Sequence, residues 1–342
     1  MVTHTPAIHM FAQQLIKYTL LNPFINIGDY SFNDPQRSDT PNLQVLAEKG
    51  MIMTDFHAGA SVCTPSRASL MTGRLGLRTG VTGNFSPDSV FGLPLNETTI
   101  AEVLHGVGYA TVMTGKWHLG HNPPYGPVHR GFDRFLGTPL SHDYGCTNHP
   151  GYDGDCPHRD QDVCLPSDPS LADGESCHIG PNNPFNESIP LMDGDDVIEQ
   201  PVDLTTLSDR YVDFALDFIA NTTSKDDSQP FFVYMPFNHM HVPVGNHRPE
   251  FTNRSVDRGV YGDTLLQLDH SIGRFIQTLE KQGLAENTLV VLTGDNGAPD
   301  GQGAYGGLND PFLGKWLKQG STGKTTTWEG GHREPGLAIW PG

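Results

Sequence analysis

The sequence has few basic residues and no long apolar run, and each shortage excludes a class of protein. Lysine and arginine number 21 against 39 aspartate and glutamate residues, so the formal net charge is −18 at pH 7. A balance this acidic argues against nucleic acid or an anionic membrane as the main partner. No run of about 18 apolar residues occurs, so no transmembrane helix is predicted. An anionic substrate would therefore need a local cluster of Lys, Arg and His.

Cysteine is also scarce, and its distribution is uneven. Of the five cysteines, Cys63 stands alone, and the others gather within residues 141–200, where we expect an irregular insertion. These clustered cysteines are Cys146, Cys156, Cys164 and Cys177. They lack the paired C-x-x-C spacing of a zinc ribbon, so two disulfides of undetermined pairing are favoured over a zinc site. Disulfides would place the protein in an oxidising compartment.

Glycosylation sequons also indicate the secretory pathway. They occur at Asn96, Asn186, Asn221 and Asn253. Residues 1–24 form an atypical N-terminal segment, because Gln13, Gln14 and Lys17 interrupt any signal-peptide core.

Strand-like and helix-like segments alternate along the chain, which predicts an α/β fold with a mainly parallel sheet flanked by helices. Helices are expected over 40–50, 98–106, 207–220 and 265–279, and strands over 109–114, 231–237 and 288–293. Another helix is expected to begin near Cys63, because proline suits a first turn and Gly73 can end it.

Residue 63 therefore falls at a helix N-terminus, a position that stabilises anions. The i, i+4 spacing places Arg67 on the same helix face as Cys63. The alternative for a lone cysteine is a buried free thiol beside an ordinary helix start.

Polar groups also follow three of the expected strands, at the edge where open α/β sheets bind ligands. Lys116 and His118 follow the strand 109–114 and should lie on one side of an extended segment, unless this is a solvated loop. His241 follows 231–237. Asp295 and Asn296 follow 288–293 and offer oxygen ligands for Ca²⁺ or Mg²⁺, although Asp-Asn-Gly is commonly a plain turn.

The string Cys63-Thr-Pro-Ser-Arg67, followed by Leu-Met-Thr-Gly-Arg74, resembles the signature of type I sulfatases. The resemblance covers residues 25–342 and is nearest to the arylsulfatase A and N-acetylgalactosamine-6-sulfatase types. It implies an alkaline-phosphatase-like domain that hydrolyses sulfate monoesters, with a sulfated small molecule, carbohydrate or glycolipid as substrate. It also implies a lysosomal or extracellular location, and oxidation of Cys63 to formylglycine by the formylglycine-generating enzyme, the hydrated aldehyde being the nucleophile.

The resemblance implies a role for each matching residue. The catalytic set is Cys63, Arg67, Lys116, His118, His241 and Lys324, and the sulfate-binding set is Ser141, Lys116, His241 and Lys324. The metal ligands for Ca²⁺ or Mg²⁺ are Asp29, Cys63, Asp295 and Asn296.

Two departures from the family pattern leave alternatives open. Gly28 stands where the family has the first of two metal-binding aspartates, and the family's C-terminal antiparallel subdomain has no counterpart after Gly342. One alternative is a phosphonate or phosphate-ester hydrolase of the same superfamily. The other is an inactive, glycan-binding pseudoenzyme.

Overall fold

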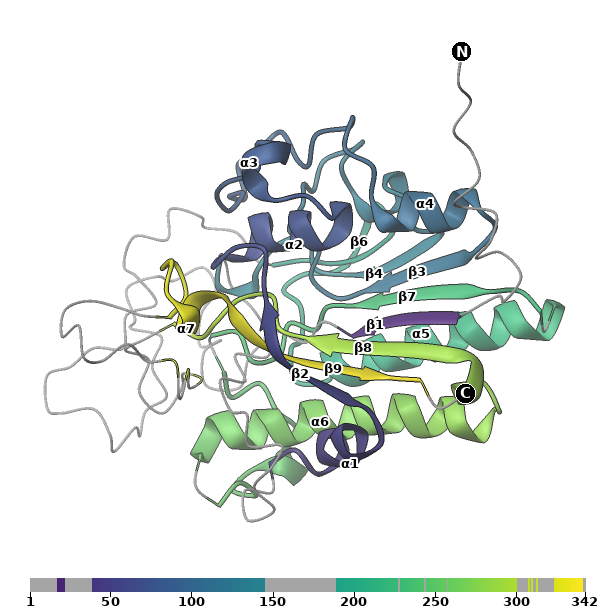
Figure 1. The fold of residues 1–342 in the computed structure, drawn as a ribbon, viewed down its shortest axis with the longest axis vertical. Helices are drawn as coiled ribbons and strands as arrows, with labels where there is room; N and C mark the ends of the chain where they lie inside the picture. The colour runs from purple at the N-terminus through teal and green to yellow at the C-terminus, as the bar shows by residue number, and fades with distance from the viewer. Residues whose placement is uncertain are drawn as a thin grey trace, which may run out of the picture.

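The computed structural model of the protein describes residues 17–21, 39–144, 189–226, 228–242, 244–256, 258–299, 307, 309, 312 and 323–340. These residues build a nine-stranded sheet with helices on both faces (Figure 1). In spatial order the strands are β2 (Met51–His57), β9 (Arg333–Ile339), β8 (Thr288–Thr293), β1 (Lys17–Leu21), β7 (Phe231–Met235), β3 (Ala110–Thr114), β4 (Arg134–Gly137), β5 (Leu191–Asp193) and β6 (Asp196–Glu199).

The centre of the sheet is parallel and its two edges are antiparallel. Strands β8, β1, β7, β3 and β4 run in one direction. Strand β9 pairs antiparallel with both β8 and β2, and β5 pairs antiparallel with β4 and β6. The predicted α/β class with a mainly parallel sheet is confirmed.

Helices cover each face of this sheet. The helices are α1 (Pro41–Lys49), α2 (Cys63–Thr72), α3 (Gly76–Thr79), α4 (Ile100–Gly106), α5 (Leu207–Lys225), α6 (Gly259–Lys281) and α7 (Glu329–His332). Figure 1 shows α1, α5 and α6 on one face and α2 and α4 on the other. None of the described helices is both long enough and apolar enough to cross a membrane.

Strand β7 shows why the sequences of the central strands are continuously apolar. Its side chains alternate between two cores: Phe231, Val233 and Met235 join the core under α1, α5 and α6, whereas Phe232 and Tyr234 join the core under α2 and α4. A strand buried on both faces needs apolar residues at every position.

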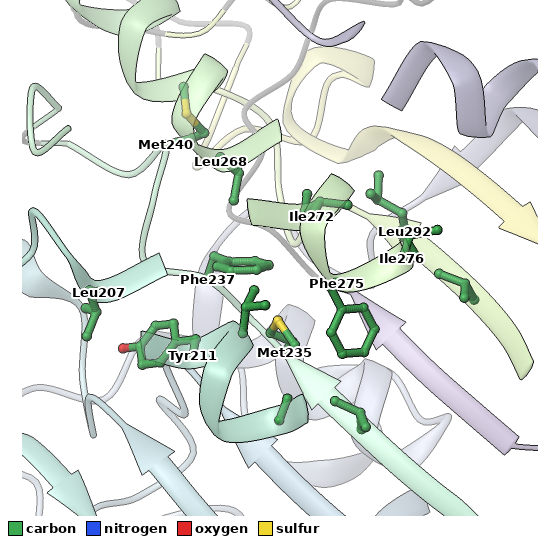
Figure 2. Packing of buried hydrophobic residues seen from close by; sticks show 14 of the residues in the cluster. Leu207, Tyr211, Met235, Phe237, Met240, Leu268, Ile272, Phe275, Ile276 and Leu292 are labelled. Carbon is green, nitrogen blue, oxygen red and sulfur yellow. The ribbon is translucent and has the colours of Figure 1, made fainter. Parts of the chain in front are cut away.

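The larger core lies between β7, β8 and the helices α5 and α6. Figure 2 shows Tyr211 of α5 and Phe275 of α6 packing toward Met235 and Phe237, which belong to β7 and the residues just after it. The amphipathic pattern predicted for 207–220 and 265–279 places these helices against the sheet.

The structure extends or corrects several predicted elements. Helix α6 begins at Gly259 rather than near residue 265, and β2 and β4 were not predicted. Strand β1 lies inside 1–24, the segment set apart from the domain, and it pairs between β7 and β8. The expectation that all of 141–200 is irregular is wrong, because β5 and β6 form a hairpin in which Asp193 pairs with Asp196 across a two-residue turn. Gly194, with φ of 62°, permits that turn.

This topology places several loops side by side at the end of the sheet where the parallel strands have their carboxyl ends. The parallel strands β3, β4, β7 and β8 all end there, and β9 begins there because it runs antiparallel to β8. Residues that follow the four parallel strands, and those that precede β9, can therefore meet although they are far apart in the sequence.

Candidate active site

Cys63 is the first residue of α2 and is 1% exposed. The residue before it, Val62, is extended, and the Ser66 N–H donates to the Val62 carbonyl at 3.2 Å. The Thr64 N–H instead donates to Oδ1 of Asn84 at 2.9 Å, and Pro65 has no N–H to satisfy. The predicted helix is present, but it begins at Cys63 itself rather than just after it, and the free Thr64 N–H has a partner outside the helix.

The surroundings of Cys63 favour negative charge. Burial raises the pKa of the thiol, but the ammonium groups of Lys116 and Lys324 outweigh burial. The net pKa of the Cys63 thiol lies well below its ordinary value. A buried position that stabilises an anion this strongly is a place where a reacting anionic group can be held.

Lys116 leaves β3 through a glycine that no other residue could replace without strain. Gly115 has φ of +130°, and a Cβ there would lie 2.0 Å from the carbonyl oxygen of Pro236. The Lys116 N–H donates to the same Pro236 carbonyl at 2.8 Å. This contact joins the exits of β3 and β7. Burial lowers the pKa of Lys116 to about 8, although Cys63 acts in the opposite direction.

His118 reaches Cys63 by a backbone turn rather than by strand alternation. Its φ is +61°, so the prediction of an extended segment with Lys116 and His118 on one side is wrong in its geometry. Both side chains nevertheless act on Cys63. The left-handed backbone conformation at His118 directs its imidazole toward Cys63 and Lys116.

The hydrogen bonding of His118 identifies its tautomer. Nε2 lies 2.9 Å from the Phe85 carbonyl oxygen, which can only accept, so Nε2 carries the proton and Nδ1 carries the lone pair. Burial, followed by the charge of Lys116, lowers the pKa of His118 to about 4. The side chain is thus a neutral imidazole with a basic nitrogen at neutral pH.

Arg67 links the helix to the end of β8. Its Nε donates to Oδ2 of Asp295 at 3.2 Å, and Nη1 donates to the Lys116 carbonyl at 2.5 Å. Both side chains of the ion pair are buried, at 0% and 2% exposure. Burial and the charge at Cys63 raise the pKa of Asp295, against the opposing effect of Arg67.

Asp295 and Asn296 fit a hard cation such as Ca²⁺ or Mg²⁺. The Asn296 amide donates from Nδ2 to the Gly297 carbonyl at 3.0 Å. Its Oδ1 is buried and has no hydrogen-bond partner within the described part of the chain. An orphaned amide oxygen beside a buried carboxylate is the kind of donor pair that these cations bind.

The rest of the expected metal site cannot be placed. Asp29 lies outside the described residues. Within the described ranges, no group of three or more His, Cys, Asp or Glu side chains could hold a metal ion. Of the expected metal ligands, the described residues therefore supply the Asp295 carboxylate and the Asn296 amide oxygen, next to residue 63.

Lys324 and His241 form a direct pair. Lys324 Nζ lies 2.9 Å from His241 Nε2, and His241 Nδ1 lies 2.7 Å from the Val242 carbonyl oxygen. Burial lowers the pKa of Lys324, but the charges at Cys63, Asp143 and Asp295 raise it above its ordinary value. Lys324 is thus held as an ammonium.

Backbone hydrogen bonds position the loop of Lys324 between two other site segments. The Lys324 N–H donates to the Ala298 carbonyl at 2.9 Å, and the Thr325 N–H donates to the Ser61 carbonyl at 2.9 Å. The first bond connects this loop to the segment after β8, and the second connects it to the approach to α2. The segment before β9 therefore lies between the cysteine and the Asp295 loop.

Ser141 and the turn that follows it lie next to His241. Ser141 is 2% exposed, and its hydroxyl oxygen is buried without a hydrogen-bond partner among the described residues. Asp143 belongs to a single 3-10 turn, His142–Tyr144, and lies next to His241. Its role was not predicted, although the sequence places it two residues after Ser141.

The structure also adds residues that the sequence did not single out. Asn84 accepts from the α2 terminus, and Glu334 of β9 is buried, with its pKa raised far above the ordinary value by burial and by Asp295. Position 334 faces position 295 if the β8–β9 register, in which Thr293 pairs with Gly336, is continued. Only that register, not the sequence, relates the two carboxyl groups.

The structure brings most of the expected site residues together. Those that converge are Cys63, Arg67, Lys116, His118, Ser141, His241, Asp295, Asn296 and Lys324. Those outside the described residues are Asp29, Cys146, Cys156, Cys164, Cys177 and Asn186. The sequon residues Asn96, Asn221 and Asn253 are exposed.

A mainly parallel sheet that gathers a buried cysteine, two lysines and two histidines at its strand ends defines a sulfatase-type α/β domain. The chain belongs to the sulfatase family, whose model, "Sulfatase", matches residues 25–342. The predicted family membership is confirmed.

Individual proteins similar to this chain are also sulfatases. The chain is 44% identical over 321 residues to arylsulfatase G of Canis lupus familiaris, a match that covers 92% of this chain and 57% of that protein. It is 41% identical over 322 residues to arylsulfatase A of Homo sapiens, covering 93% of this chain and 57% of that protein. The crystal structure of the PsFucS1 sulfatase from Pseudoalteromonas sp. matches with a TM-score of 0.76 and 25% identity, over 98% of this chain and 64% of that one. The chain thus spans a little over half the length of these curated relatives.

Proposed function

We propose that this chain is the catalytic domain of a sulfatase that hydrolyses sulfate monoesters, with formylglycine at position 63 and a bound Ca²⁺ or Mg²⁺ ion. One observation carries the proposal: the ammonium groups of Lys116 and Lys324, from two separate segments, both stabilise negative charge at a single buried position. Membership of the sulfatase family and the arylsulfatase relatives support the same reading.

The proposed formylglycine and divalent cation would supply a nucleophile and positive charge. A hydrated aldehyde at residue 63 would provide the attacking hydroxyl, and a divalent cation held by Asp29, Asp295 and Asn296 would offset the charge of the sulfate.

The chain's own residues would perform the remaining tasks. Lys116 and Lys324 neutralise the non-bridging sulfate oxygens, and Ser141 can donate to one of them. Arg67 keeps Asp295 oriented through the 3.2 Å ion pair. Because these groups are fixed and buried before substrate arrives, little reorganisation is needed when charge develops.

His118 and Lys324 suit opposite proton transfers. His118 is neutral, with Nε2–H engaged by Phe85 and the Nδ1 lone pair available to accept a proton beside residue 63. His241 Nε2 accepts one hydrogen bond from the Lys324 ammonium, and Lys324 can deliver another of its protons to the departing alcohol oxygen.

Several finer assignments belong to the same proposal. The substrate would be a sulfated carbohydrate, glycolipid or aryl ester, and the protein would be lysosomal or extracellular. The clustered cysteines of 141–200 would form disulfides, the four sequons would carry glycans, and the formylglycine-generating enzyme would act during maturation.

The test combines modification and turnover. The chain is expressed with the formylglycine-generating enzyme, and the peptide containing residue 63 is analysed by mass spectrometry. We expect the aldehyde at residue 63, turnover of p-nitrophenyl sulfate or of a member of a sulfated-sugar panel, and no turnover by Cys63→Ala. Unmodified cysteine alongside a modified control sulfatase would contradict the formylglycine assignment. Turnover confined to phosphodiesters would favour the phosphate-ester alternative, and absence of any turnover by aldehyde-bearing protein would favour a pseudoenzyme.

A further inference from the structure

We propose that Asn84 is a positioning residue, whose side-chain amide holds the first turn of α2, and with it residue 63, in a fixed place relative to His118. The inference rests on the proposed function, since it concerns how the nucleophile at residue 63 and the base that deprotonates it are kept together.

The first turn of α2 has no cap of its own. Val62 precedes the helix and has no side-chain oxygen, so it cannot accept from the N–H groups that are unpaired at a helix start. A Ser, Thr, Asp or Asn at that position would ordinarily accept from the second or third helical N–H. The second residue of α2 is Thr64, and its N–H donates instead to Asn84 Oδ1 at 2.9 Å, across a separation of 20 residues. Another segment therefore supplies the cap.

Two hydrogen bonds in opposite directions join Thr64 to this segment. Thr64 donates its N–H to Asn84, and its Oγ1 accepts from the Phe85 N–H at 3.3 Å. Thr64 is 0% exposed, so water has little access to replace either partner. Because residue 64 adjoins residue 63, these bonds fix the backbone at the position of the nucleophile.

The same two residues also contact the base. The Phe85 carbonyl oxygen lies 2.9 Å from His118 Nε2, and this bond makes Nδ1 the basic nitrogen of the ring. Phe85 is 7% exposed and belongs to the same apolar core as Ala68 and Met71 of α2. Asn84 and Phe85 thus connect the start of α2 to His118 within two consecutive residues.

Burial differs between the two residues of this connection. Phe85 is held by the core, whereas Asn84 is exposed and contributes its amide to Thr64. Substitutions at exposed positions generally change stability little. A change at Asn84 can therefore remove the Thr64 bond without disrupting the core, which separates an effect on positioning from an effect on folding.

Loss of the Asn84 bond would leave the Thr64 N–H without its acceptor and let the first turn of α2 shift relative to His118. Proton transfer requires the two groups to lie within hydrogen-bond reach, and a displacement of about 1 Å can lower a rate by about 10²-fold. The sulfate-binding residues Lys116 and Lys324 belong to the segments after β3 and before β9, not to α2. We therefore expect kcat to fall while KM changes little.

Two substitutions separate the hydrogen bond from the shape of the side chain. Asn84→Leu removes the acceptor at similar size, and Asn84→Asp keeps an acceptor oxygen in the same place. For p-nitrophenyl sulfate or a sulfated sugar, we expect Asn84→Leu to lower kcat by about tenfold or more and to change KM by less than about twofold. Asn84→Asp should keep kcat within about threefold of wild type.

Asn122→Leu is the matched control. Asn122 is also exposed, and its amide makes one hydrogen bond to a backbone carbonyl, that of Ser89, with no connection to α2. Its replacement should change neither kcat nor KM.

A second measurement does not depend on turnover. NMR of ¹⁵N-threonine-labelled protein follows the exchange of the Thr64 N–H with solvent. We expect exchange to be faster by about tenfold or more in Asn84→Leu and unchanged in Asn84→Asp, at equal urea midpoints of unfolding.

Separate results would overturn the two proposals. An unchanged kcat in Asn84→Leu, an equal loss in Asn84→Leu and Asn84→Asp, or unaltered Thr64 exchange would overturn the positioning role. A wild-type protein that turns over no sulfate ester would overturn the proposed function. Faster Thr64 exchange in Asn84→Leu would in that case still establish that Asn84 holds the first turn of α2.

Discussion

The amide oxygen of Asn296 is a residue-scale feature that folding alone does not explain. A buried polar atom without a partner costs about 1–3 kcal/mol. Within the described residues Asn296 Oδ1 has no hydrogen-bond partner, whereas Nδ2 of the same amide is bonded. A cation that binds beside Asp295 would satisfy this oxygen and offset that cost.

Asn296→Ala should therefore weaken Ca²⁺ binding more than it weakens the fold. We expect at least about a tenfold loss of affinity in calorimetric titration, because a hard cation depends on the number of its oxygen ligands. Asn122→Ala is the matched control, since Asn122 also donates one amide hydrogen bond to a backbone carbonyl, that of Ser89. Equal Ca²⁺ affinity in wild type and Asn296→Ala would show that Asn296 is not a ligand.

At the scale of elements, the exits of β3 and β7 are held together at Gly115. The missing side chain lets the Pro236 carbonyl approach, and the Lys116 N–H then donates to it. The geometry of this contact decides where Lys116 leaves the sheet. The contact at the end of β3 thus sets the position of the Lys116 ammonium.

Gly115→Ala should disturb both stability and the site. A Cβ 2.0 Å from the Pro236 oxygen must displace backbone, and the positive φ adds strain of about 1–3 kcal/mol. We expect a lower urea midpoint, together with loss of turnover as Lys116 shifts. Gly106→Ala in α4 is the control, because a Cβ there meets no atom within 4 Å, and alanine should leave stability unchanged or raise it. A Gly115→Ala protein as stable and active as the control would contradict this account.

At the scale of the whole molecule, buried titratable groups make stability depend on pH in opposing directions. Burial, reinforced by His247, lowers the pKa of His239 to about 4, whereas burial raises the pKa of Asp269 to about 6. His239 therefore stabilises the folded state above the unfolded pKa of about 6.5, and this contribution is lost as the pH falls through 4. The contribution of Asp269 is present below about 3.9 and is lost as the pH rises through 6.

Two variants separate these effects. The stability difference between wild type and His239→Gln should shrink by about 3 kcal/mol as the pH falls from 7 to below 4. The difference between wild type and Asp269→Asn should change by a similar amount in the opposite direction, as the pH rises from below 4 to 7. Urea unfolding at a series of pH values measures both. Differences that do not vary with pH would show that these side chains titrate alike in the folded and unfolded states.

Sequence patterns predicted the elements whose signals are local. The apolar periodicity of 207–220 and 265–279 and the apolar runs at 231–237 and 288–293 correspond to α5, α6, β7 and β8. The edge strand β2 was missed because several of its residues are polar or exposed, so it shows no continuous apolar run. It pairs with β9, about 280 residues away, and no local pattern reveals such a partner.

The sequence by itself determined the family, the presence of a helix beginning next to Cys63 and the residue types around it, because a helix terminus and a short motif are local features. Only the tertiary structure decided how Lys116, His118, His241 and Lys324 meet. The left-handed turn at His118, the close approach at Gly115 and the antiparallel entry of β9 each depend on contacts between strands distant in sequence. The place of Asp143 against His241 was decided in the same way, since it arises from the meeting of the loops that follow β4 and β7. Spacing along a chain does not encode such contacts, because they exist only once the sheet has assembled.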